Sequence, residues 1–296
     1  MITPEPGRAN APLHCPPQSS PSIVISASRD WRSAMALAAA DISETMRLWP
    51  LVWTLSLFDI KLRYRGSLLG PFWLTLSTAV MVGSIGFLYS RLFHQEISNY
   101  LPFLTISLVL WSFINTVTAE GSICFTQAQG LIHGTRMPHS LHAARVVMRN
   151  ILVLAHNLVV IVAVFALFRT TPSLASFSIL PACLLWVVDA FAIALLLGIF
   201  GARFRDIPPI IGSIMQIAFY LTPIMWNPVM LEHRGLAKAL IELNPFFGLL
   251  EIMRGPLMGL PIEPHTWLMT LAYSAALILI TGLVFTRARP RIPYWI

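Results

Sequence analysis

Three basic side chains stand at alternate positions of the segment DIKLRYRG, namely Lys61, Arg63 and Arg65. Ammonium and guanidinium groups at this density can bind phosphate oxygens through charge-assisted hydrogen bonds. They can equally anchor the apolar segment that follows on the basic side of a membrane. The two uses are compatible, and the residues alone leave both open.

Asp189 is the clearest acid inside an apolar segment, LLWVVDAFAIALL. A charge at the centre of a bilayer costs roughly 2.5–3.5 kcal/mol on insertion scales. Asp189 could relay protons in a proton-coupled carrier. The interpretation that we favour is a buried polar side chain hydrogen-bonded to a neighbouring helix.

The other reactive residue types form no recognisable constellation. No acidic pair or His–Asp cluster stands at a position that would face a membrane interface, and three cysteines give no disulfide framework. The chain has no Gly-Lys dipeptide, and therefore no GxxxxGK[ST] loop for nucleotide phosphates. We predict no catalytic residue and no metal site.

Six stretches free of Asp, Glu, Lys and Arg are each long enough to cross a bilayer, which takes about 20 helical residues. Buried helices of soluble proteins are shorter and carry a polar side. The composition agrees, with 11 % charged and 56 % hydrophobic residues and a mean hydropathy of +0.71. We predict an all-α integral membrane protein with six transmembrane helices. The stretches are 66–90, 97–119, 150–168, 170–202 with Asp189 as an interruption, 207–231 and 264–286.

The basic residues are distributed unevenly between the connections. If the amino terminus is cytoplasmic and the chain crosses six times, 15 Lys and Arg lie inside and five lie outside. This positive-inside asymmetry predicts that both termini are cytoplasmic. The pI of about 9.8 reflects these juxtamembrane clusters, which meet anionic headgroups, so we predict no nucleic-acid partner.

The chain divides into four parts. Residues 1–28 carry six of the 22 prolines and no apolar period, which is typical of a disordered tail, here cytoplasmic. Residues 29–66 are predicted to form amphipathic interface helices. The six-span domain covers 67–286, and a basic cytoplasmic carboxyl end covers 287–296.

Four strings in this chain together resemble one protein family. DIKLRYRGSLLGPFWL (59–74) places Leu-Gly-Pro and Trp after a basic-aromatic stretch, and RFRDIPPIIGSIMQIAFYLTPIMW (203–226) joins an Arg-Asp-Ile turn to an apolar span. LNPFFGLLEIMRGPLMG (243–259) contains an Asn-Pro segment, and VFTRARPRIPYWI (284–296) is a basic tail. In this order they resemble the type-2 ABC export permeases for O-antigen, capsule and teichoic acid (Wzm-like).

The resemblance implies a homodimeric, non-enzymatic permease that exports a polyprenyl-diphosphate-linked polysaccharide across the bacterial inner membrane. It implies no cofactor on this chain, with ATP and Mg supplied through a separate Wzt-like ABC ATPase dimer. It also implies re-entrant extracytoplasmic helices within 227–263, although the residues alone equally allow a surface loop of two interface helices. Lys61, Arg63 and Arg65 then become candidates for binding the diphosphate.

A sugar chain needs a passage lined by aromatic faces and hydrogen-bonding side chains. An alternative is that small and hydroxyl residues pack helix on helix, and that the aromatic residues form interface belts. The channel-lining candidates are Phe72, Trp73, Thr75 and Thr78 in the first span and Gln216, Phe219, Tyr220 and Trp226 in the fifth.

The cytoplasmic connection 127–141 is longer than a simple turn needs. We predict that it forms a short helix that receives motion from the ATPase, although an ordinary loop is the alternative. The candidate coupling residues are Gly130, His133, Arg136 and Pro138. His133, Gly134 and Thr135 depart from the family pattern, which has more Lys and aromatic residues here.

Three rival functions stay open. The same fold could export another cargo, such as a drug or a lipid. A proton-coupled carrier would use Asp189 and need no ATPase. A membrane-embedded glycosyl- or acyltransferase is disfavoured by the missing catalytic groups.

Overall fold

The computed structural model describes residues 30–70, 72–92, 94–169, 177–228 and 235–296, and these ranges contain helices and no strand. The predicted all-helical class is confirmed. The predicted tail 1–28 lies outside the described residues. In chain order the α-helices are α1 (Trp31–Arg47), α2 (Trp49–Arg63), α3 (Phe72–Leu92), α4 (Ile97–Gly121), α5 (Cys124–Gln127), α6 (Gln129–Gly134), α7 (Ser140–Phe168), α8 (Ile179–Arg203), α9 (Ile207–Leu221), α10 (Gly235–Glu242), α11 (Pro245–Leu257), α12 (Pro264–Ala288) and α13 (Ile292–Trp295).

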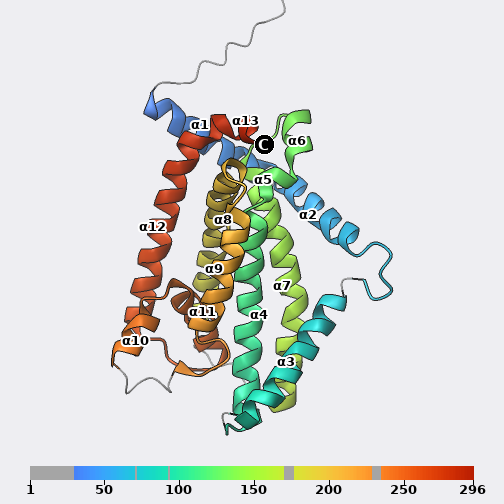
Figure 1. Cartoon of the computed structure of the whole chain (residues 1–296), viewed down its shortest axis with the longest axis vertical. Coiled ribbons are helices and arrows are strands. Elements are labelled where there is room, and N and C mark those ends of the chain that lie inside the picture. The colour runs from blue at the N-terminus through green and yellow to red at the C-terminus, as the bar shows by residue number, and fades with distance from the viewer. Residues whose placement is uncertain (1–29, 71, 93, 170–176, 229–234) are drawn as a thin grey trace, which may run out of the picture.

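Five helical segments of the described chain are long and apolar enough to cross a membrane: α3, α4, α7, α8 and the segment that begins with α12. Figure 1 shows α4, α7, α8 and α12 running along the long axis, with α3 inclined beside them. The fifth predicted span, 207–231, is described as far as residue 228, and the α-helix of that described part is α9. Its 15 residues extend about 22 Å at 1.5 Å per residue, less than a bilayer core.

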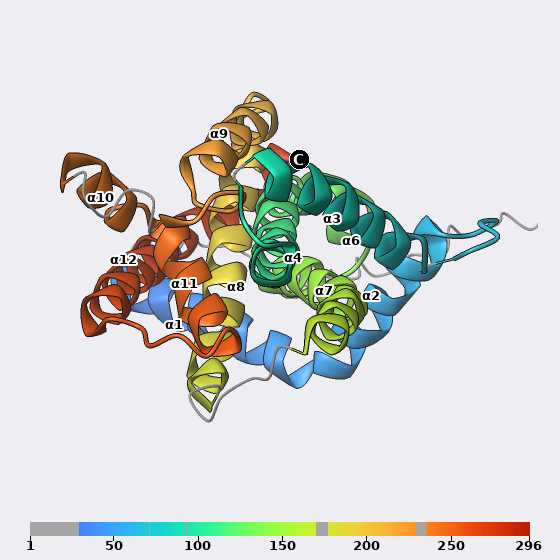
Figure 2. The same cartoon turned by 90° about the horizontal axis from the view of Figure 1, so that it is seen from below.

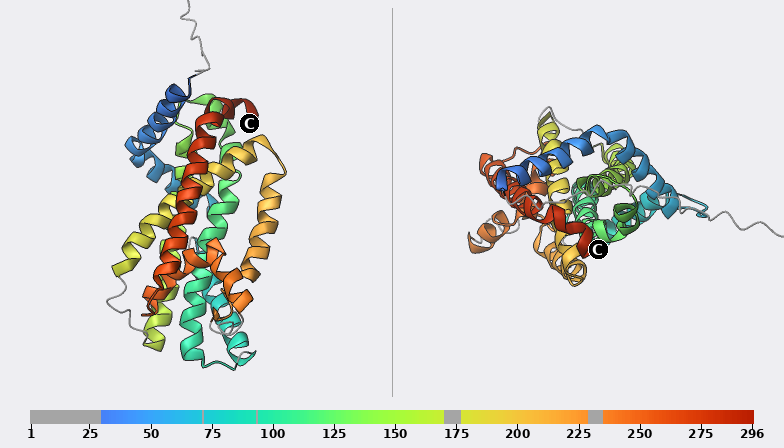
Figure 3. Two further views of the ribbon diagram at one scale, coloured as in Figure 1. Left: turned by 90° about the vertical axis from the view of Figure 1, so that its left-hand side faces the viewer. Right: turned by 90° about the horizontal axis from the view of Figure 1, so that it is seen from above.

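Helix α9 ends early because of Pro223. A proline disfavours the helical conformation of the residue before it, and Thr222 is extended, with φ −87° and ψ 137°. Figure 3 shows α9 running in the same general direction as the longer helices. The count of six crossings therefore stays a prediction.

Helix α4 is the centre of the bundle. Seen from below in Figure 2, it lies among α3, α7, α8, α9 and α11, and it packs against each of them. Its most apolar 18-residue window is 83 % buried, against 17 % for α3. The other helices thus position their functional side chains relative to α4.

Small residues bring α4 and the chain just after it close to α8. A Cβ atom on Gly121 would lie 2.7 Å from Ala194 Cα, and one on Gly201 would overlap the backbone oxygen of Ser122. Close backbone approach at small residues is how helices associate in membranes.

The two ends of the molecule are built differently. Helices α1, α5, α6 and α13 gather at the end that carries the C-terminus, and α2 leads away from it, whereas α10 and α11 lie toward the opposite end (Figures 1 and 3). Helix α11 begins at Pro245, where the side chain of Asn244 accepts a hydrogen bond from Phe246 N at 3.0 Å. It packs among α4, α8 and α12. Its re-entrant character stays a prediction.

Candidate functional site

A chain of ion pairs joins α2, α4 and α7 near the C-terminal end of the bundle. Asp59 and Arg63 are four residues apart on α2, as are Arg145 and Arg149 on α7, and this spacing places each pair on one helix face. Glu120 is contributed by the end of α4. The contacts run Arg145–Asp59–Arg149–Glu120–Arg63.

Arg149 is the central link of this junction, and its side chain is 10 % exposed. It donates to Asp59 Oδ2 at 2.9 Å and to Glu120 Oε2 at 2.8 Å. Arg145 binds the same Asp59 through two guanidinium nitrogens, and Asn150 Nδ2 donates to Glu120 Oε2 at 2.7 Å. Three cations against two acids leave the junction with one net positive charge.

The three diphosphate candidates have different surroundings. Arg63 Nη2 donates to Glu120 Oε1 at 2.7 Å, and this hydrogen bond raises the pKa of the Arg63 guanidinium. Lys61 and Arg65 are exposed and form no ion pair within the described residues. The structure therefore ties one of the three to the junction and leaves two available to an anion. Their role with a diphosphate stays a prediction.

A second polar junction joins α1 to the start of α7 and to Arg289, the residue directly after α12. The side chain of Asp41 on α1 is fully buried, and its Oδ1 accepts from Ser140 N at 2.9 Å and from Ser140 Oγ at 2.6 Å. Its Oδ2 accepts from His139 N at 3.2 Å and from Arg289 Nε at 2.8 Å. Burial alone would raise the pKa of Asp41, but the Ser140 and Arg289 hydrogen bonds outweigh it and hold that pKa below its usual value.

The coupling candidates lie on and after α6. Gly130, His133 and Arg136 are exposed, whereas Pro138 is buried just before α7 begins. His133 Nε2 lies 3.1 Å from Pro293 O, so α6 is in contact with α13 at the carboxyl end. The predicted short helix within 127–141 is present. Its role in coupling stays a prediction.

The first-span lining candidates divide into two groups. Phe72 and Trp73 are exposed at the start of α3. Thr75 Oγ1 donates to His156 O, and Thr78 Oγ1 donates to Asn157 Oδ1, both at 3.3 Å. The two threonines therefore take part in packing α3 on α7, which is the alternative use of hydroxyl residues in a span.

The fifth-span candidates differ in the same way. Gln216 and Tyr220 are exposed on α9. Phe219 packs on Trp111 of α4, with ring centroids 5.9 Å apart, and Trp226 is half-buried beyond the helix. The structure brings neither set into one passage within a single chain, so the lining role stays a prediction.

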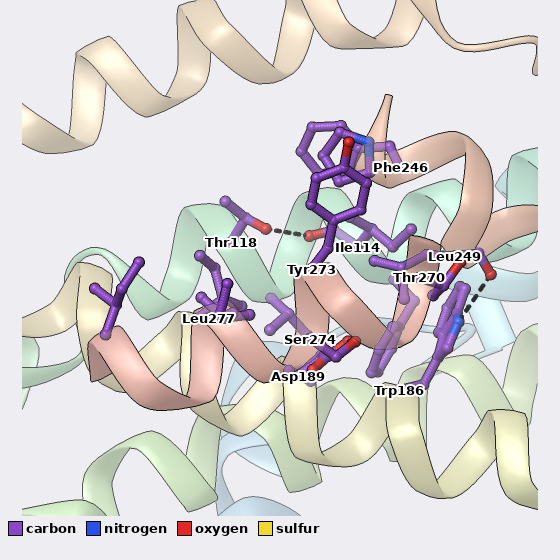
Figure 4. A pocket seen from close by; sticks show the side chains of 17 residues that line it. Ile114, Thr118, Trp186, Asp189, Phe246, Leu249, Thr270, Tyr273, Ser274 and Leu277 are labelled. Atoms are coloured by element: carbon purple, nitrogen blue, oxygen red, sulfur yellow. Dashed lines mark hydrogen bonds between the residues drawn. The ribbon is translucent and has the colours of Figure 1, made fainter. Parts of the chain in front are cut away.

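Asp189 lies in a largely apolar pocket of about 350 Å³ between α4, α8, α11 and α12 (Figure 4). Asp189 is 6 % exposed. Oδ2 accepts from Ser274 Oγ of α12 at 2.6 Å, as expected for an acid bonded to a neighbouring helix. Oδ1 has no hydrogen-bond partner within the described residues. Trp186, one turn earlier on α8, donates its indole N–H to Leu249 O of α11 at 2.9 Å.

The importance of Arg254 does not follow from the sequence, in which it is one of the five basic residues predicted to lie outside. Arg254 is 2 % exposed on α11 and donates to Ser107 Oγ of α4 at 3.0 Å and to Pro223 O at 2.8 Å. It also pairs with Glu251 at 2.5 Å and lies 4.3 Å from the centroid of the Phe103 ring. The available signal was an acid and a base three residues apart in an otherwise apolar segment.

Comparison with known proteins gives consistent results. A family model described as ABC-2 type transporter matches residues 50–258. The chain is 23 % identical over 235 residues to an O-antigen export system permease protein RfbA of Klebsiella pneumoniae, covering 79 % of this chain and 90 % of that protein. It is 21 % identical over 192 residues to a protein of the same name from Myxococcus xanthus, covering 65 % of this chain and 74 % of the relative.

Proposed function

Because this chain belongs to the ABC-2 type transporter family, we propose that it exports a polyprenyl-diphosphate-linked surface polysaccharide, an O-antigen or capsule, across the inner membrane. The family makes it a multi-pass permease subunit whose partner is an ABC ATPase. The further proposals are that it works as a homodimer, that the ATPase is a Wzt-like dimer which binds ATP and Mg, and that both termini are cytoplasmic.

The observation that carries the cargo assignment is the likeness to O-antigen export permeases over 79 % of the chain. The exposed cations Lys61 and Arg65 support it, since they lie beside the α2–α4–α7 junction and are available to phosphate oxygens. The exposed aromatic residues at the start of α3 and on α9 offer faces on which sugar rings can stack.

We propose that α6 and its neighbours couple this chain to the ATPase. Helix α6 contacts α13, and Asp41 of α1 binds both the start of α7 and the end of α12. A movement of α1 caused by the ATPase would therefore be transmitted to α7 and α12, through the Asp41–Arg289 ion pair and the hydrogen bonds of Asp41 to the start of α7.

The test is ATP hydrolysis by the chain purified with an ABC ATPase and reconstituted in lipid. A stable complex whose hydrolysis responds to a lipid-linked glycan supports the proposal. Ile132→Pro removes the hydrogen bond that Ile132 N donates to Ala128 O, so it breaks α6 and should uncouple hydrolysis from glycan. Gly130→Ala is the matched control, because a Cβ at this position meets no atom within 4 Å. Absence of both a complex and a coupled hydrolysis would overturn the proposal.

The same preparation distinguishes a glycan cargo from a drug or a lipid cargo. Hydrolysis that responds to a drug or a lipid but not to the glycan identifies the same fold with another cargo. A proton-coupled carrier predicts that Asp189→Asn abolishes transport without any ATPase. The exporter predicts that Asp189→Asn keeps ATP-driven transport, since Asn can still accept the Ser274 hydrogen bond.

A further inference from the structure

A groove of about 700 Å³ lies at the end of the bundle that carries the C-terminus. The last turns of α8 and α12 form its walls, together with α1 and α13. Its volume falls in the range of about 300–1,000 Å³ that is typical of small-ligand sites. Three arginine side chains line it, Arg203, Arg287 and Arg291.

These three arginines have no acidic partner within the described residues. Aromatic rings lie against two of them instead. The Arg203 guanidinium carbon lies 5.4 Å from the Phe204 ring centroid and 5.7 Å from that of Trp295. The Arg287 guanidinium lies 5.6 Å from the Trp31 ring centroid. A ring attracts a cation without neutralising it, so the groove keeps three positive charges.

The rest of the lining is apolar and belongs to the spanning helices. It includes Ile199 and Phe200 of α8 and Leu283 and Val284 of α12. The groove thus combines a cationic rim with an apolar floor, at the point where α8 and α12 end in basic residues. That combination fits an amphiphile with an anionic headgroup.

We propose that this groove binds one anionic phospholipid of the surrounding membrane. The phosphate accepts hydrogen bonds from the three arginines, and the acyl chains lie on the apolar floor. This inference goes beyond polysaccharide export, because the groove is formed by other elements than the Lys61–Arg65 segment. Bound lipid would fasten α1 and α13 to the ends of α8 and α12.

The test counts lipids on the purified full-length chain by native mass spectrometry, with phosphatidylglycerol and phosphatidylcholine of identical acyl chains. We expect one phosphatidylglycerol per chain to survive delipidation and phosphatidylcholine to be lost. Replacing Arg203, Arg287 and Arg291 together with Gln should weaken retention about a hundredfold, at roughly a factor of five for each arginine. Replacing Arg32, Arg47 and Arg205 with Gln removes the same charge outside the groove and should leave retention unchanged.

A variant with Lys at positions 203, 287 and 291 controls for misfolding, because it keeps the three positive charges. If this variant elutes as a single species and retains the lipid, the result supports the site. Equal retention of both lipids, or unchanged retention in the triple Gln variant, would overturn the proposal. Displacement of phosphatidylglycerol by a polyprenyl diphosphate, one for one, would also overturn it by assigning the groove to cargo.

Discussion

At the scale of single residues, Arg149 is the link that joins the two acids of the α2–α4–α7 junction. It is the common partner of Asp59 from α2 and Glu120 from α4, and each of these acids also binds a second arginine. Removing one member of a buried ion pair costs more than the pair contributes, because the remaining charge stays buried. Arg149 should therefore matter more than its partners at the exposed rim.

We predict that Arg149→Met destabilises the protein by about 3 kcal/mol, because Asp59 and Glu120 lose their shared partner in a poorly solvated site. Thermal unfolding in detergent measures this change. Arg47→Met is the matched control, since Arg47 is exposed on α1 and forms no ion pair within the described residues, so its effect should stay within about 0.5 kcal/mol. Equal effects of the two substitutions would contradict a structural role for the junction.

Asp41 should make stability depend on acid pH. Its pKa is held below the usual value of 3.8 in the folded protein, so the stability it contributes is complete above that value. The contribution is lost as the pH falls through the lowered folded-state pKa. Asp41→Asn removes it, so the difference in unfolding free energy between wild type and variant should be constant at neutral pH and shrink below pH 3.8.

Unfolding titrations at a series of pH values measure that difference. Glu44→Gln, an exposed substitution on the same helix, supplies the control and should give a small difference. A difference for Asp41→Asn that stays constant into acid would contradict the assignment.

At the scale of elements, the close contact between α4 and α8 depends on glycines, which have no side chain to separate the two helices. Gly121 and Gly201 bring the backbones close enough for atoms of one helix to occupy the space of a missing side chain on the other. Such contacts replace the hydrophobic effect, which is absent between helices in lipid. They fix the depth at which Asp189 and Glu120 lie relative to each other.

Gly201→Ala should therefore destabilise the bundle by roughly 1–3 kcal/mol through overpacking against Ser122. Gly282→Ala on α12 is the control, because its Cβ meets nothing within 4 Å and alanine favours the helix. The melting temperature should fall for Gly201→Ala and should stay the same or rise for Gly282→Ala. A tolerated Gly201→Ala would mean that α8 shifts freely against α4.

The spanning helices can be predicted from the sequence, because long uninterrupted apolar runs have few other physical explanations. It did not predict the short α9, since the effect of Pro223 depends on whether the chain turns at Thr222 or continues. It identified Asp189 as buried, and Ser274 is its partner. The pairing of Asp59 with Arg145 and the burial of Arg254 were out of reach, because both depend on which helix faces which.

At the scale of the whole molecule, α1 and the C-terminus lie at the same end, and α10 lies toward the other (Figure 1). An even number of crossings requires this arrangement of the termini. The basic residues follow it, since the arginine groove and both polar junctions are near the C-terminal end.

We expect Tyr294→Cys to react with a membrane-impermeant maleimide only from the cytoplasmic side, and Lys238→Cys only from the outside. Both positions are exposed in the structure. The measurement uses spheroplasts and inverted vesicles of a variant without Cys15, Cys124 and Cys183. Labelling of both positions from one side would contradict the predicted topology.

The central place of α4 also has a consequence for biosynthesis. Helix α4 leaves the ribosome before α7, α8 and α11, the helices that later cover it. Until α7 follows, Glu120 has Arg63 but lacks Arg149, and Ser107 waits for Arg254, which is 147 residues further along the chain. Helix α4 therefore enters the membrane before these partners on α7 and α11 have been translated. The packing around α4 is completed only when α11 has been translated. A nascent chain that ends before α11 therefore lacks the contact between Ser107 and Arg254.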